Sequence, residues 1–167
     1  MDELTIAGVL LALFALVILV GSRAWRRAYL EQLPALEGER TLFEERGITV
    51  DTVPQVGRGT RFPNSLLRLT DRRLVVAQQV LFRPHSHYLR YVVVLDDTPA
   101  SAEALGTRGA LAHGYITFRA RRADLALVRD RRGPHLAIRG DRAEGLAVPA
   151  EVRVFTRRPD ELATLLA

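Results

Sequence analysis

An almost wholly apolar run without a charged residue extends from Leu4 to Ser22. As a helix rising about 1.5 Å per residue, it would reach roughly 28 Å, close to the hydrocarbon thickness of a bilayer. A buried core helix is the weaker interpretation, because a helix that is apolar all round needs a large protein around it. We therefore expect residues 1–22 to form an N-terminal transmembrane anchor.

A cleaved signal peptide is the main alternative to a retained anchor. Such a peptide has a positive N-terminal region, a shorter apolar core and small residues at its cleavage site. Here Asp2 and Glu3 precede the run, and Arg23 follows Ser22 where small residues are favoured. The pattern favours retention.

The flanks of the run indicate its orientation. Arg23, Arg26 and Arg27 follow it, whereas no basic residue precedes it. The positive-inside bias then predicts a single-pass protein of the cell (inner) membrane, with its N-terminus outside and its long part in the cytoplasm. Trp25 and Tyr29 lie where amphipathic rings settle at the headgroup level, although both could instead pack against the following domain.

Residues 23–35 are expected to form a juxtamembrane helix and linker, since an amphipathic pattern runs from position 23 until Pro34 limits it. The remaining residues, 36–167, suffice for one domain. The chain has no cysteine, which excludes disulfides and thiolate metal sites. Its net charge is +5, and all 24 basic residues are arginine.

That basic balance suits anionic lipid headgroups near a membrane. Nucleic acid is the other common acidic partner of a basic domain. We do not expect nucleic acid here, because the domain is predicted to be tethered to a membrane.

Short β-like runs follow the linker, and they predict a mainly β domain of about seven strands with a closing helix. A loop is expected at 56–64, a tight turn at Asp71-Arg72, and a break at Pro84. Gly133 suits the turn of a late hairpin. The runs span residues 41–50, 65–70, 73–82, 87–95, 112–120, 124–129, 134–139 and 151–156.

The C-terminal segment has the pattern of an amphipathic helix. Pro159 suits a first helical position. Leu162, Leu165 and Leu166 then form one apolar stripe at i, i+3 and i+4.

The segment NSLLRLTDRRLVVAQQVLF, with its motif from Leu69 to Leu74, resembles the central hairpin of GRAM and bacterial PH-like domains. Gly38-Glu39 before a strand resembles the start of those domains, and the last strand with its helix resembles their end. The resemblance covers nearly all of residues 36–167. It implies a PH-like domain, a seven-stranded barrel of two packed sheets capped by a short C-terminal helix, which the predicted orientation would place in the cytoplasm. It further implies binding of lipids or protein partners rather than catalysis.

Arginines supply the candidate ligand-binding residues, because guanidinium groups suit phosphate well. Six of them flank the late hairpin and would lie near one end of the sheet if the strands pair. A solvated charged face, interleaved with Asp124 and Asp130, is the alternative. The resemblance places two more bases, in the loop before the strand at 65–70, roughly where PH-like domains hold phosphate. The lipid or phosphate candidates are Arg58, Arg61, Arg119, Arg121, Arg122, Arg129, Arg131 and Arg132.

Catalytic and metal chemistry are not expected. His85 and His87 could share a strand face, but a metal site needs a third ligand. Asp96-Asp97 precede Thr98-Pro99 and are expected in a turn. The glycines at 57–59 lack the context of a phosphate loop, and no nucleophile motif occurs. We predict no cofactor and no enzyme activity.

The sequence thus favours a membrane-anchored interaction module that holds a protein partner at the cytoplasmic face. Direct reading of anionic lipid headgroups through the arginine-rich hairpin is the alternative.

Overall fold

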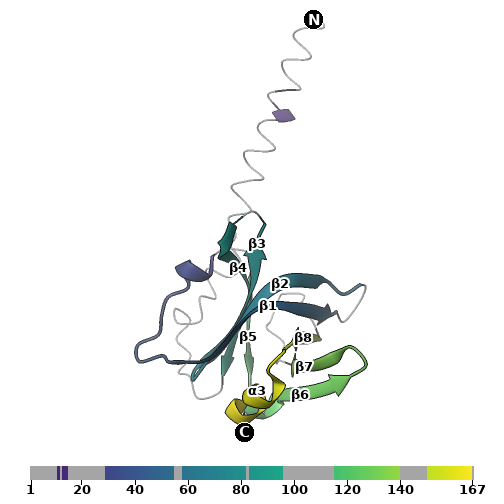
Figure 1. Cartoon of the computed structure of the whole chain (residues 1–167). Coiled ribbons are helices and arrows are strands. Elements are labelled where there is room, and N and C mark those ends of the chain that lie inside the picture. The colour runs from purple at the N-terminus through teal and green to yellow at the C-terminus, as the bar shows by residue number, and fades with distance from the viewer. Residues whose placement is uncertain are drawn as a thin grey trace, which may run out of the picture.

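The computed structural model describes residues 11, 13–14, 29–54, 58–81, 83–95, 115–139 and 150–166. They form a curled, mainly β half-barrel of eight strands with one C-terminal helix (Figure 1). The strand order is β5-β4-β3-β2-β1-β8-β7-β6. The elements are η1 (Leu30–Gln32), β1 (Thr41–Val53), β2 (Arg61–Thr70), β3 (Arg73–Val80), β4 (Arg83–Leu95), β5 (Ile116–Ala120), η2 (Arg122–Asp124), β6 (Leu125–Asp130), β7 (Gly133–Ile138), β8 (Glu151–Phe155) and α3 (Pro159–Leu166).

The strand count corrects the expected barrel of seven. All eight sequence runs correspond to strands. Strands β1 to β4 form an antiparallel meander, and β6 to β8 form a second one that joins β1 through β8. β5 is the unexpected element, because it pairs with β4 in parallel and so extends that edge of the sheet.

The concave face of the sheet holds the main core. Its largest fully buried side chains include Leu67, Leu69, Leu74 and Leu136, and Leu162 from α3 packs into the same cluster. The predicted helix and its apolar stripe are confirmed, since Leu165 and Leu166 also pack against this core. The helix thereby covers apolar area that the curled sheet alone would leave in water.

The convex face of β2, β3 and β4 carries a second apolar cluster, which the N-terminal segment covers. Leu30 and Leu33 of residues 29–39, here called the strap, pack on Leu66, Val75 and Ala77. This cover explains why the run from Leu74 to Ala77 in β3 is apolar without alternation, because both faces of the strand are buried.

Over its described residues, the strap is not the α-helix that the amphipathic pattern predicted. Tyr29 has extended backbone angles and forms an isolated β-bridge with Tyr88. Only a 3₁₀ turn, η1, follows it before Pro34. Pairing with the sheet edge thus replaces helical bonding at Tyr29, and residues 23–28 lie outside the described part.

Most of the predicted anchor lies outside the described residues as well. Leu11, Leu13 and Phe14 are helical, and 76%, 52% and 68% exposed. Within the described part of the chain, no helix meets the length and apolarity that a membrane crossing requires.

The turns at Asp71-Arg72 and at 131–133 are confirmed, and Gly133 has φ +115°. Two strand bounds differ from expectation. β2 begins at Arg61 within the predicted loop, because β1 continues to Val53 and offers it partners. Pro84 lies inside β4 rather than in a break, where the β3–β4 register is irregular between the Val80–Arg83 and Gln79–His87 pairs.

Gly47 marks a bulge in β1, with φ +69°. A Cβ there would lie 2.9 Å from Arg157 Nη2, which donates to the Gly47 carbonyl. We expect Gly47→Ala to lower the free energy of unfolding by about 1–2 kcal/mol, because alanine is strained in the left-handed region. Gly47→Asn is the control in urea unfolding and should lose less, since asparagine tolerates that region. Equal losses in the two variants would contradict this account.

Candidate functional site

A basic pocket of about 260 Å³ lies beside β1, β2 and β8 and the β6–β7 turn. Asp51 of β1 is its only lining acid among the described residues. Arg61 of β2, Arg132 of the turn and Arg153 of β8 supply three guanidinium groups. The four charged side chains sum to +2, so the pocket favours an anion.

Strand register explains why three of these residues meet. Asp51 pairs with Arg61 across the β1–β2 ladder and with Arg153 across the β1–β8 ladder. Directly opposed residues in antiparallel strands have Cβ atoms about 5 Å apart, so the three side chains form a row across three strands. The carboxylate thus lies between two arginines.

Ion pairs orient the arginines. Asp51 Oδ1 lies 3.2 Å from Arg61 Nε, and Asp51 Oδ2 lies 3.3 Å from Arg132 Nη1. The first pair lacks hydrogen-bond geometry, and buried Oδ1 accepts no hydrogen bond from the described residues. The side chains of Arg61 and Arg132 remain 67% and 65% exposed, so their other donors are open to a ligand.

Glu151, two residues earlier in β8, orients the Arg153 side chain. Glu151 accepts from Arg153 Nε at 2.5 Å and from Arg139 Nε at 2.7 Å. Burial raises the pKa of Glu151, but these arginine hydrogen bonds outweigh it and leave the pKa below its ordinary value. The ionised carboxylate therefore fixes Arg153 at the pocket. Planar guanidinium forks held in this way suit carboxylate or phosphate oxygens.

Of the predicted arginines, the structure brings Arg61 and Arg132 together in this pocket. Arg58 is exposed three residues before Arg61, and Arg131 is exposed in the turn. Arg129 instead forms an ion pair with Asp160 of α3 at 3.0 Å.

The expected cluster of six arginines is not formed. β5, which carries exposed Arg119, pairs with β4 at the opposite edge of the sheet from β6. Arg121 pairs with Asp124, and Arg122 donates to the Asp71 carbonyl at 2.6 Å. These residues precede β6, whereas Arg129 lies near the end of β6 and Arg131 and Arg132 follow it, so most of the length of this strand separates the two groups.

Asp51 and Arg153 were missed from the sequence. Each lies in an alternating strand and resembles any solvent-facing charge. Only the register of β1 with both neighbours places them beside Arg61, and a strand's own residues do not determine that register.

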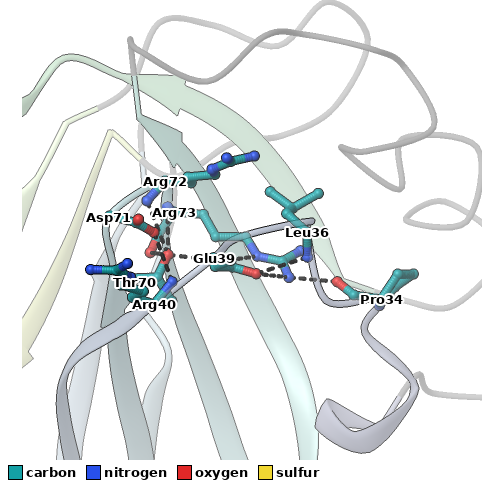
Figure 2. A network of polar contacts seen from close by, with 8 residues as sticks. All are labelled: Pro34, Leu36, Glu39, Arg40, Thr70, Asp71, Arg72 and Arg73. Atoms are coloured by element: carbon teal, nitrogen blue, oxygen red, sulfur yellow. Dashed lines mark hydrogen bonds and ion pairs between the residues drawn. The ribbon is translucent and has the colours of Figure 1, made fainter.

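The residues that carry the family resemblance share a second polar network (Figure 2). Glu39 of the strap accepts from Arg73 Nε and Nη2, both at 2.7 Å, and from Thr70 Oγ1 at 2.8 Å. Arg73 Nη2 also donates to the Pro34 carbonyl, and Arg40 N donates to Asp71 at 3.0 Å. Figure 2 shows that these contacts join the strap to the β2–β3 turn.

This second network holds the strap on the sheet and is not a candidate ligand-binding site. The pocket of about 160 Å³ beside it has two arginines, Arg68 and Arg73, in its lining. Arg68 is paired with Glu44, and Arg73 with Glu39. Because its charges are balanced, this pocket attracts an anion less than the basic pocket does.

The remaining predicted residues have separate surroundings. The Tyr29 ring packs on Tyr88 with centroids 5.0 Å apart, as the packing alternative expected. Arg23, Trp25, Arg26 and Arg27 lie outside the described residues, as do Asp96 and Asp97.

The two strand histidines differ in exposure. His85 is exposed, whereas His87 is buried. Burial, with Arg46 nearby, lowers the pKa of His87. Over the described ranges, no group of three histidine or carboxylate side chains is placed to hold a metal ion.

No family model, curated protein or solved structure matches this chain.

Proposed function

We propose that this chain is a single-pass protein of the inner membrane whose cytoplasmic PH-like domain is a non-catalytic interaction module. It positions a protein partner beside the membrane. The observation that carries the proposal is the strap, which fixes the start of the domain to the convex face of the sheet through the buried Glu39–Arg73 pair. In a domain held in this way, the N-terminal segment joins the sheet at a fixed place, as a positioning module requires.

Two further observations support the anchor and the module. Leu11, Leu13 and Phe14 are apolar side chains that the rest of the described chain leaves uncovered, and a bilayer would cover them. The β2–β3 hairpin and the closing helix after the last strand are the features on which the PH-like resemblance rests, and both are present.

The topology is tested by cysteine labelling, for which the natural absence of cysteine is an advantage. Arg131→Cys places a thiol in an exposed turn of the full chain. We expect a membrane-impermeant maleimide to label it only after permeabilisation. Labelling in intact cells would contradict the cytoplasmic orientation, and extraction of the chain by alkaline carbonate would contradict the anchor.

The basic pocket favours a second function, which is the binding of anionic lipid headgroups. Arg61, Arg132 and Arg153 converge there around a single carboxylate, with two of their side chains well exposed. The ligand class is an anion with carboxylate-like or phosphate oxygens, and the headgroup of an anionic phospholipid is one source.

Charge reversal at the β6–β7 turn tests the pocket with a matched control. Arg132 lines it, whereas neighbouring Arg131 does not. For full chain in neutral detergent titrated with a short-chain, water-soluble phosphatidylglycerol, Arg132→Glu should weaken binding about tenfold or more, since hydrogen bonds to charged groups contribute about 1.5–3 kcal/mol. Arg131→Glu should change binding by less than about threefold, and added salt should weaken it. Equal losses in the two variants, or no binding at all, would remove the lipid function and leave the protein partner.

A further inference from the structure

Leu81 is the most exposed large apolar side chain in the described part of residues 29–166. It lies in the turn between β3 and β4 and is 77% exposed. Exposed Arg83 follows two residues later. A single exposed leucine is common in soluble domains, so exposure of Leu81 alone does not indicate a contact. The position of its turn relative to the predicted anchor is the additional argument.

The tether joins the domain in the half of the sheet that carries this turn. Tyr29, the first described residue of the strap, forms a bridge with Tyr88 in the first half of β4. The strap then runs to the opposite end of the sheet, where the Arg40 backbone amide donates a hydrogen bond to Asp71 in the β2–β3 turn. In Figure 1 the β3–β4 end of the sheet and helix α3 lie at opposite ends of the domain.

We propose that the β3–β4 turn contacts the leaflet in which the chain is anchored, with Leu81 inserted at the interface and Arg83 at the level of anionic headgroups. This inference rests on the proposed function, since it requires the anchor. The partner is therefore the lipid bilayer itself, and no soluble ligand is involved.

Chain length permits this contact. Ser22 ends the apolar run seven residues before Tyr29, so the end of the span lies within about 25 Å of Tyr29. Gln78 of β3 pairs with Tyr88, and Leu81 follows Gln78 by three residues, so the turn extends about 10 Å beyond the bridge. The turn can therefore reach the level at which the predicted span leaves the bilayer.

The chemistry of the two side chains suits an interface. Leucine loses contact with water among acyl chains, whereas the arginine stem lies along apolar surface and its guanidinium stays with phosphates. Tethering raises the local concentration of the turn at the membrane. A weak contact through one leucine and one arginine is therefore enough to hold the turn at the membrane surface.

The test uses full chain in vesicles of phosphatidylcholine and phosphatidylglycerol, labelled at a single cysteine with an environment-sensitive fluorophore. Leu81→Cys reports on the turn. Leu42→Cys is the matched control, because Leu42 is also exposed but lies at the start of β1, next to Thr41, which pairs with Thr70 at the opposite end from the β3–β4 turn. We expect a blue-shifted emission that nitroxide-labelled lipids quench at position 81, and neither effect at position 42.

A third label separates the inference from the proposed function. Phe14→Cys places the fluorophore in the apolar run, where an anchor would bury it deeply. Quenching at 14 with water-like emission at both 81 and 42 would overturn the contact and leave the anchor in place. Water-like emission at 14 would overturn the anchor, and the contact with it.

Discussion

Replacing Arg73 by leucine is expected to lower the free energy of unfolding by about 3–5 kcal/mol, because it leaves a buried carboxylate without its partner. Glu39 and Arg73 have side chains that are only 8% and 5% exposed. The substitution removes both charged hydrogen bonds to Glu39 and the bond to the Pro34 carbonyl. Urea unfolding of the full chain in detergent, followed by far-ultraviolet circular dichroism, measures the loss.

An exposed ion pair provides the control for this variant. Arg129 and Asp160 have side chains that are 69% and 90% exposed. Asp160→Asn should therefore change stability by less than about 1 kcal/mol. The double variant Arg73→Leu with Glu39→Leu should recover much of the loss, since it removes the unpaired charge. If Arg73→Leu unfolds at the same urea concentration as the unaltered chain, the strap is not held by this pair.

The same pair predicts an acid dependence. Burial raises the pKa of Glu39, but hydrogen bonds from Arg73, the Leu36 amide and Thr70 outweigh it and hold the pKa below its ordinary value of 4.5. A carboxyl with a depressed folded pKa contributes stability that is present above its unfolded pKa and is lost as pH falls through the folded pKa. The loss should begin as pH falls below about 4.5 and should be smaller in Glu39→Gln, which cannot titrate at that position.

Replacing Leu162 by alanine is expected to destabilise the domain by about 2–5 kcal/mol, the range for a buried leucine that leaves a cavity. Leu162 is fully buried in the main core, where Leu165 and Leu166 of α3 are only partly buried. Thr164→Ala, an exposed change in the same helix, should be nearly neutral. Similar unfolding midpoints for the two variants would show that α3 contributes little to the core.

Local patterns predicted the elements of this fold well. The turn at Asp71-Arg72, the glycine turn at Gly133 and the helix from Pro159 each depend on residues close in sequence, and each is observed. The parallel placement of β5 and the strap over the convex face depend on contacts between distant segments. Tyr29 illustrates the difference, since a helical pattern around it yields to pairing with Tyr88.

The candidate site was predicted in part for the same reason. Arg61 and Arg132 are recognisable as exposed bases in or beside loops, whereas Asp51 and Arg153 are single charges within strands. They join the pocket because β1 pairs with β2 on one side and with β8 on the other. Arg119 lies elsewhere because β5 pairs with β4 rather than with β6, and Arg121 and Arg122 lie at the start of β6, away from the turn at its end.

The central place of β1 also bears on the order in which the domain is completed during synthesis. Strands β1 to β4 are contiguous in the chain and can pair as soon as they leave the ribosome, and the strap meets Arg73 within the same segment. The second edge of β1 stays unpaired until β8 has been synthesised, some hundred residues later, because Thr49 pairs with Phe155. A nascent chain would therefore expose a free strand edge and part of its main core until β8 emerges, a state open to aggregation.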